Sequence, residues 1–595
     1  MPERRRIELA AVAMVAIVVV TMARVAQVAA LHDQGFFEKY LVIADRIAHG
    51  SIPRERLGDL SPGYLWLIVA LRAWFGAGFA AIRTMQIAGV SLAAVFAGIV
   101  AVRLRGLTAG IAAVVFVLQS RAALVCATEA EPETLILVTG AAALMCFVEA
   151  IHRNGQSRIA WLVAAGASFG LSATARPAAL LIVLALAVWL ARPQGAPRAR
   201  GIAAFAGAAL LPVAIVVGAN FALTGEAAIM DPGTVFYEGM NPLATGYAGV
   251  QPKIINDLEA KTTEPDALHL AYRYIASRAA GRALTRAESN RYWSGKALAF
   301  VRLYPGSALR LIGRKIGLTL MSHDSWDLST MEAKSHELSR EIWVPFGLLV
   351  VLSVAAFALA WRNGTMASIL PPVLFAKAGG IVLIVFYVTA RQRNAILPAM
   401  AVLAAVGVVD LAALLQDNLP RGVLAIALVA VSAVALGMHT NAQREDDHGW
   451  MAPQVAAYDR RFAQEEVRRG NVARARHHLA VAEIWSPGAV RNVPPMALRG
   501  AATDELRAAG DDDSRRFDCA LALLRANALT EADSLLRELA KTRYAPRREN
   551  RTVSSLAYFR AVIAARRGSM RDAILLAAEA EQVAPGDPHV LALRV

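Results

Sequence analysis

Apolar blocks of roughly twenty residues recur along this chain, from residues 7–31 to a last block that ends near residue 438. A helix of that length spans the hydrocarbon core of a bilayer. Of the 595 residues, 56% are hydrophobic and only 18% are charged, so these blocks cannot all be buried inside a soluble fold of this size. The sequence therefore predicts an all-α, polytopic helical membrane protein.

The positive charge of the chain lies mostly in the gaps between these blocks. A formal net charge of +15 would also suit a nucleic-acid-binding protein, but the arginines cluster in short gaps, as in the cytoplasmic loops of membrane proteins. The clusters are Arg4–Arg6, Arg103 and Arg105, Arg153 and Arg158, Arg192, Arg198 and Arg200, and Arg362. We expect no nucleic-acid partner. Arginine- and alanine-rich usage is typical of bacteria with GC-rich genomes, which favours a multi-pass protein of the bacterial inner membrane with a cytoplasmic amino terminus.

Eleven spans follow from this distribution. The first block resembles a signal peptide in outline, but its apolar core is long and further spans follow, so residues 8–30 are interpreted as the first span. Residues 61–76 contain Arg72, and a crossing there would place the Arg103 loop outside. We therefore predict an amphipathic helix on the outer interface. The other spans are predicted at 80–101, 107–126, 134–151, 159–175, 177–192, 201–223, 342–361, 366–390, 394–415 and 421–439.

This threading divides the chain into four parts. Residues 1–223 form a transmembrane module with a first outer loop at 31–79. They are followed by an outer, periplasmic insertion at 224–340, carboxyl-terminal spans at 341–439 and a periplasmic tail at 440–595. Three tail segments share one outline, a helix, a small or polar turn and an alanine-rich helix, which resembles degenerate tetratricopeptide repeats. Docking of a protein partner on the tail and a helical cap without a partner both remain open.

Two acidic clusters are predicted to emerge at the outer face. Asp33, Glu38 and Asp45 follow the first span, and Glu129, Glu131 and Glu133 occupy the turn between two later spans. Carboxylates at such a boundary can deprotonate a hydroxyl nucleophile or hold a divalent cation against a phosphate. We predict Asp33, Glu38, Glu131 and Glu133 as catalytic residues. A Mg²⁺ or Mn²⁺ ion held by Asp33 and Glu129 is a further possibility.

The order of motifs resembles the GT-C class of membrane glycosyltransferases, in particular the family of protein O-mannosyltransferases and bacterial aminoarabinose transferases. The resemblance covers about residues 5–415. Its elements are an acid after the first span, Tyr40, Ala44 and Gly50, "SPGYLWL", "EPETL", "GLSATARPAAL", the pattern of Phe236, Tyr237, Gly239, Asn241 and Pro242, and "RQRNAILPAM".

One element departs from the family pattern. The family's first-loop acid lies three or four residues before the tyrosine, whereas Asp33 lies seven before Tyr40 and Glu38 only two. The identity of the catalytic acid therefore stays open. We prefer Asp33, because it directly follows the membrane exit, as the catalytic acid of the family does.

The resemblance implies an enzyme that moves a sugar from a polyprenyl-phosphate-linked donor to an acceptor hydroxyl or similar nucleophile, with inversion. In that reaction Asp33 would be the general base. The acceptor is unknown. Guanidinium groups bind phosphate in a bidentate manner, although arginines at span ends also extend to lipid headgroups. The predicted donor-phosphate ligands are Arg391, Arg393, Arg176 and Lys315, and the predicted substrate-binding residues are Tyr64, Tyr237, Asn241 and His323.

Two other functions remain alternatives. A lipid-linked sugar transporter or flippase would show inverted repeats and charges at mid-membrane, whereas most charges here lie at span ends. A non-catalytic membrane scaffold would act through its repeat tail. Replacing Asp33 by Asn would separate these functions, because a scaffold does not depend on that carboxylate.

Overall fold

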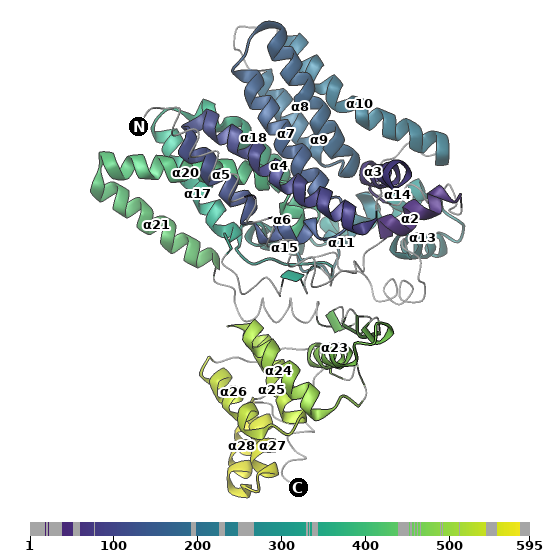
Figure 1. Cartoon of the computed structure of the whole chain (residues 1–595), viewed down its shortest axis with the longest axis vertical. Coiled ribbons are helices and arrows are strands. Elements are labelled where there is room, and N and C mark those ends of the chain that lie inside the picture. Colours follow the sequence, from purple (N-terminus) through teal and green to yellow (C-terminus); the bar gives the residue numbers. More distant parts are fainter. Residues whose placement is uncertain are drawn as a thin grey trace. The chain divides into compact units, whose positions relative to one another are not determined.

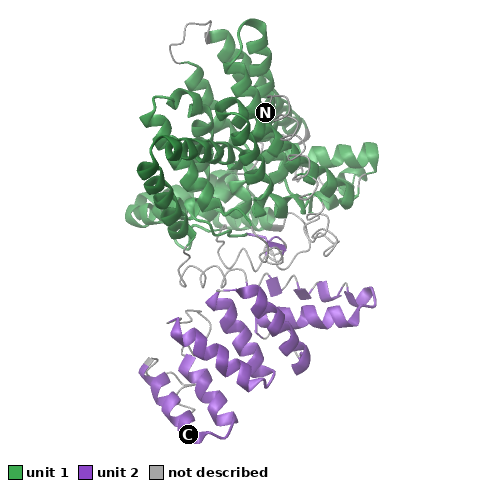
Figure 2. Cartoon of the chain, turned by 60° about the vertical axis from the view of Figure 1, so that its left-hand side comes forward, with its two compact units in different colours: residues 1–326, 342–437 green, residues 327–341, 438–595 purple. Residues whose placement is uncertain are grey.

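The computed structural model describes residues 39–50, 60–76, 78–191, 198–224, 232–247, 267–328, 343–437, 466–487, 492–510, 512–542 and 556–583, with isolated positions outside these ranges. Every regular element among them is a helix, which confirms the predicted all-α class. The chain divides into two compact units, Met1–Trp326 with Ile342–Gly437 and Asp327–Glu341 with Met438–Val595. Figure 2 colours these units separately.

The helices that are apolar enough to cross a membrane belong to the first unit, and Figure 1 labels its elements. In chain order its elements are α2 (Lys39–Ala48), α3 (Pro62–Phe75), α4 (Phe79–Arg105), α5 (Leu107–Leu118), α6 (Arg121–Ala127), α7 (Glu133–Ile151), α8 (Gly155–Ala175), α9 (Ala179–Leu190), α10 (Arg198–Thr224), α11 (Pro232–Gly239), α13 (Ala267–Ala280), α14 (Arg286–Leu303), α15 (Pro305–Leu320), α17 (Phe346–Arg362), α18 (Met366–Val385), α19 (Ala390–Arg393), α20 (Leu397–Asp417) and α21 (Leu419–Gly437).

Six helices of the described residues are long and apolar enough to cross a membrane. They are α4, α7, α18, α20, α21 and the stretch Ala199–Ala222 of α10. The span predicted at 107–126 is a broken one, because α5 and α6 meet at an angle of 54°. Each predicted span from residue 80 onward coincides with a described helix or helix pair. The span predicted at 8–30 lies outside the described residues except for Val18 and Met22, and the count of eleven stays a prediction.

Glycines allow two of the long helices to approach closely. α8 packs against α10, and Gly166 and Gly170 lie one turn apart on its contact face. A Cβ added at Gly166 would lie 2.1 Å from the carbonyl oxygen of Phe205, and one at Gly170 would lie 2.4 Å from that of Ala209. Small residues four apart permit this kind of backbone contact between helices in membranes. A larger side chain would push α8 and α10 apart.

Three of the predicted cytoplasmic arginines, Arg103, Arg105 and Arg153, lie at one end of the helices. The carboxylate of Glu149, near the end of α7, accepts hydrogen bonds from Arg103 at 2.6 Å and from Arg153 at 3.2 Å. Arg105 pairs with Asp410 of α20 at 2.7 Å. Since α7 begins at Glu133 and ends at Ile151, a length of about 28 Å, these pairs lie at the opposite end of the bundle from the acidic turn.

The second unit consists of helices that pack mainly on their neighbours in the chain. Its longer helices are α23 (Val472–Trp485), α24 (Pro495–Ala509), α25 (Asp513–Arg525), α26 (Leu529–Lys541), α27 (Leu556–Arg566) and α28 (Met570–Val583). α23, α24, α25, α26 and α27 each contact the next helix in the chain, around a core that includes Trp485, Phe517 and Leu536. Sequential packing of this kind is typical of helical repeats. The tetratricopeptide class itself stays a prediction.

Candidate active site

The acidic turn between α6 and α7 is buried. Glu129, Glu131 and Glu133 have exposed fractions of 0%, 1% and 1%. The sequence alone would also be compatible with an open loop in which these carboxylates face solvent. Pro132 directly precedes α7 and Glu133 is its first residue; a carboxylate there is favoured by the helix dipole. Burying a charged carboxylate is costly unless it is paired, so the partners of these side chains define the site.

Cations from three other segments meet this turn. Oε1 of Glu133 accepts from Arg176 at 2.6 Å and from Arg391 at 2.9 Å. Arg391 also lies 3.8 Å from Oε2 of Glu131, whose Oε1 lies 2.8 Å from Nζ of Lys39. We call these five residues the carboxylate–cation cluster. The structure thus brings together four residues that the sequence predicted for the site, Glu131, Glu133, Arg176 and Arg391.

A hydrogen-bonded bridge supports the turn from the first loop. The hydroxyl of Tyr64 in α3 donates to Oε1 of Gln86 in α4 at 2.6 Å. Nε2 of Gln86 donates to the carbonyl oxygens of Glu129 at 2.5 Å and Ala127 at 3.1 Å. The ring of Tyr40 packs edge-on against Tyr64, with ring centroids 4.8 Å apart. The predicted substrate residue Tyr64 is therefore part of the framework that fixes the acidic turn.

Sequence reasoning missed two of these participants, Lys39 and Gln86. Lys39 stands beside Tyr40 in the first loop and supplies the cation for Glu131. Gln86 is a buried amide within the apolar helix α4, with an exposed fraction of 3%. A polar side chain at such a position was a usable signal, because polar groups inside membrane helices face the protein interior and need partners.

Burial changes the acid–base properties of the turn. It raises the pKa of the Glu131 carboxyl above its ordinary value, Glu133 adds to the rise, and Lys39 and Arg391 oppose it. Burial also raises the pKa of Tyr64 well above its ordinary value, with a further contribution from Glu131, so Tyr64 stays a neutral donor. A carboxylate with a raised pKa is a stronger base than an exposed one.

Two predicted phosphate ligands lie outside the cluster. Arg393 is 3% exposed, donates to the carbonyl oxygen of Leu318 at 2.5 Å and stacks on Phe346. Lys315 is fully buried and donates to the carbonyl oxygen of Phe386, which follows the last residue of α18. Burial lowers the pKa of Lys315 to about 7. No described contact joins either residue to the cluster, and their role in phosphate binding stays a prediction.

The predicted substrate residues of the insertion have local roles in the fold. Asn241 is buried and its Nδ2 donates to the carbonyl oxygens of Tyr237 at 2.8 Å and Glu238 at 3.2 Å, which closes α11. The ring of Tyr237 packs against the ring of Trp293, with ring centroids 4.7 Å apart. His323 lies on the stretch that follows α15, partly buried. Contact of these residues with a substrate stays a prediction.

The predicted first-loop acids Asp33 and Glu38 lie outside the described residues. Of the two predicted metal ligands, Asp33 therefore lies outside the described residues and Glu129 lies within them. Within the described part of the chain, no group of three or more His, Cys, Asp or Glu side chains could hold a metal ion, and Glu131 and Glu133 have cationic side chains as partners. These residues alone do not fit a metal site, and the Mg²⁺ or Mn²⁺ ion stays a prediction.

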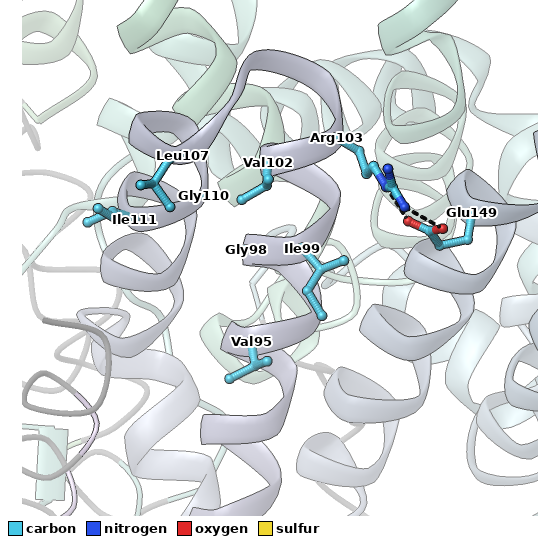
Figure 3. A pocket seen from close by; sticks show the side chains of 9 residues that line it. All are labelled: Val95, Gly98, Ile99, Val102, Arg103, Leu107, Gly110, Ile111 and Glu149. Carbon is cyan, nitrogen blue, oxygen red and sulfur yellow. Dashed lines mark hydrogen bonds and ion pairs between the residues drawn. The ribbon is translucent and has the colours of Figure 1, made fainter. Parts of the chain in front are cut away.

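A surface cavity of about 230 Å³ opens between α4 and α5, far along α4 from the cluster. Figure 3 shows apolar side chains along it and the Arg103–Glu149 ion pair at one end. Since Glu149 and Glu133 lie at opposite ends of α7, this cavity is not part of the candidate active site. Its lining residues are Val95, Gly98, Ile99, Val102, Arg103, Leu107, Gly110, Ile111 and Glu149.

No protein-family model matches the chain, and no curated protein matches its sequence. Among solved structures it is similar to the oligosaccharyltransferase AglB from Archaeoglobus fulgidus, in complex with an inhibitory peptide and a dolichol-phosphate. The TM-score is 0.39 and the identity 14%, over 75% of this chain and 59% of that chain. The apo form of the Archaeoglobus fulgidus enzyme gives a TM-score of 0.38 at 14% identity, with the same coverage.

A second neighbour is ArnT from Cupriavidus metallidurans in the apo state. The TM-score is 0.29 and the identity 17%, over 75% of this chain and 80% of that chain. The chain spans only 59% of the length of the AglB chain that it matches.

Proposed function

We propose that this protein is a membrane glycosyltransferase that moves a sugar from a polyprenyl-phosphate-linked donor to an acceptor hydroxyl at the outer face of the inner membrane. The observation that carries the proposal is the carboxylate–cation cluster, which four separate segments build around Glu131 and Glu133. Buried ion clusters are costly to a fold, and ionisable groups at membrane depth mark functional sites. This cluster offers both a base and phosphate-binding cations.

The donor phosphate suits the cationic side of the cluster. Two carboxylates, Glu131 and Glu133, face three cations, Lys39, Arg176 and Arg391, so a phosphate can enter these five groups without leaving an uncompensated negative charge. The planar guanidinium groups of Arg176 and Arg391 match phosphate oxygens in a bidentate manner. The isoprenoid tail of such a donor would lie in the bilayer and its phosphate at a membrane surface, and the cluster likewise lies at one end of the helices.

The transfer follows from this arrangement. The acceptor oxygen attacks the anomeric carbon from the face opposite the phosphate, which inverts that carbon, and its proton passes to a carboxylate. The bond between the anomeric carbon and the phosphate oxygen breaks, and its electron pair leaves with the polyprenyl phosphate. Arg391 and Arg176 stabilise the charge on the leaving group. We assign the base to Asp33, with Glu38 as the alternative in the first loop and Glu131 as the described carboxylate of raised pKa.

The test is a donor panel. Purified protein is incubated with labelled polyprenyl-phosphate sugars and a panel of hydroxyl acceptors, and the release of free polyprenyl phosphate is measured. We expect release with at least one donor, its loss in Arg391→Gln and its retention in Arg105→Gln, whose ion pair with Asp410 lies away from the cluster. Release that is equal in both variants, or absent for every donor with folded protein, contradicts the proposal. A flippase would instead move the labelled lipid across a vesicle membrane without releasing phosphate.

A further inference from the structure

Asp324 joins the end of the outer insertion to the arginine-bearing helix α19. Its Oδ2 accepts from Nη2 of Arg121 at 2.9 Å and from Nε of the same residue at 3.1 Å. Its Oδ1 lies 3.7 Å from Nη1 of Arg393. The Asp324 side chain is 12% exposed, so these are ion pairs of reduced solvent screening. One carboxylate thus connects α6, α19 and the stretch after α15.

α19 depends on such contacts for its orientation. It comprises only Ala390–Arg393, and a single helical turn is not stable by itself. The backbone carbonyl oxygen of Ser325, the residue after Asp324, accepts a hydrogen bond from the backbone amide of Ala390 at 2.6 Å. On the other side, Nδ2 of Asn394 donates to the carbonyl oxygen of Ala122 at 3.4 Å. The residues after α15 and the helix α6 therefore hold α19 from both of its ends.

The two arginines of α19 point in different directions. Residues two apart in a helix lie about 200° apart around its axis. Arg393 is directed to Asp324 and to the carbonyl oxygen of Leu318, while Arg391 reaches Glu133 at 2.9 Å. Because both arginines belong to this one turn, a rotation of α19 moves both guanidinium groups. A misplacement of about 1 Å in a site of this kind can cost about 100-fold in rate.

We propose that Asp324 is a positioning residue for Arg391: by holding Arg393 and Arg121, it fixes the one-turn helix α19 and with it the guanidinium that binds the donor phosphate. This assignment deepens the proposed function and rests on it. It gives the end of the outer insertion a part in donor binding, although no described contact joins Asp324 to the cluster itself. A neutral side chain of the same size would not have this role, because Asp324 pairs with the two arginines through its negative charge.

The test compares two variants of Asp324 with a matched control. Asp324→Asn keeps the size of the side chain and removes its charge, and Asp324→Glu restores the charge. Asp410→Asn breaks an Asp–Arg pair of similar burial at the other end of the helices, with an Asp410–Arg105 distance of 2.7 Å. We expect the donor KM to rise about tenfold in Asp324→Asn, to recover at least in part in Asp324→Glu, and to change less than twofold in Asp410→Asn. An unchanged KM in Asp324→Asn, or an equal change in Asp410→Asn, overturns the assignment.

A second measurement does not need activity. The loss of apparent Tm in detergent is compared for Asp324→Asn, Arg391→Gln and the double variant. If Asp324 positions Arg391, the loss in the double variant is smaller than the sum of the single losses, since the second change removes contacts already weakened by the first. Asp410→Asn combined with Arg391→Gln should be additive. Additive losses in both pairs overturn the positioning role, and they do so even if no donor supports transfer and the proposed function fails.

Discussion

Nη1 of Arg391 lies 2.9 Å from Oε1 of Glu133, although 258 positions separate the two residues in the chain. The carboxylate is 1% exposed and the arginine side chain 13%. Removing one partner of a buried ion pair is destabilising, and loss of Arg391 would leave Arg176 as the remaining described cation for the buried Glu133 carboxylate. The pair therefore links the α7 end of the acidic turn to α19, and it is the first contact to test.

Replacing Arg391 by Gln should abolish most of the transfer. The substitution leaves Glu133 with Arg176 and Glu131 with Lys39, and it removes a cation from the developing charge of the leaving group. We expect kcat/KM to fall about 100-fold or more. Arg391→Lys should recover only part of the loss, since lysine lacks the planar fork. A comparable fall in Arg105→Gln would mean that the loss reflects folding and not the site.

The bridge through Gln86 should be needed for the shape of the acidic turn. Gln86→Leu keeps the size of the side chain but removes the hydrogen bonds to Tyr64 and to the carbonyl oxygens of Ala127 and Glu129. We expect kcat/KM to fall roughly tenfold because the carboxylates shift. Steady-state kinetics would measure this. The control is Ser353→Ala, which removes a buried hydroxyl bonded between α17 and α20; if both variants lose activity alike, the turn is not specifically affected.

Lys315 should make the stability of the fold depend on pH. Its pKa falls from an ordinary value of 10.5 to about 7 in the folded protein because of burial. Between these two values the unfolded chain binds a proton that the folded chain does not, so stability rises with pH. Lys315→Met removes this dependence. Melting in detergent from about pH 6 to about pH 9 should show wild type gaining apparent Tm relative to Lys315→Met as the pH rises. If apparent Tm changes with pH in the same way in wild type and Lys315→Met, the lowered pKa of Lys315 is contradicted.

Replacing Asp33 by Asn should distinguish the proposed enzyme from a scaffold. If Asp33 is the general base, the variant loses transfer by about 100-fold or more while its expression and any partner of the tail are retained. Glu38→Gln serves as the comparison, because Glu38 is the other acid of the first loop. A larger loss in Glu38→Gln would move the base to that residue. Equal activity in both variants and wild type would remove the first loop from the mechanism.

The membrane helices could be predicted closely from the sequence. The span predicted at 201–223 is contained in α10, Arg198–Thr224. It is a long apolar block that follows Arg200 and ends before Glu226, and charged residues at both ends of a block leave little freedom for the ends of the helix. The break between Leu118 and Arg121 was not predicted. Hydropathy averages over such a bend, since both halves of the span are apolar.

The candidate site was predicted only in part. The sequence indicated that Glu131, Glu133, Arg176 and Arg391 belong together, because they end segments at one face of the predicted topology. It could not separate Arg391 from Arg393, since their directions depend on how the single turn of α19 is held. Lys39 was missed for a related reason. It pairs with Glu131, and the two residues are too far apart in the sequence for helical periodicity to predict their contact.

The glycines of α8 also limit how the protein can move. Because a Cβ at Gly166 would lie only 2.1 Å from the carbonyl oxygen of Phe205, the backbones of α8 and α10 interlock. Sliding one past the other would drive that carbonyl into a bulkier residue. We therefore expect α8 and α10 to keep this contact, and a conformational change of the first unit to take place at other helix contacts.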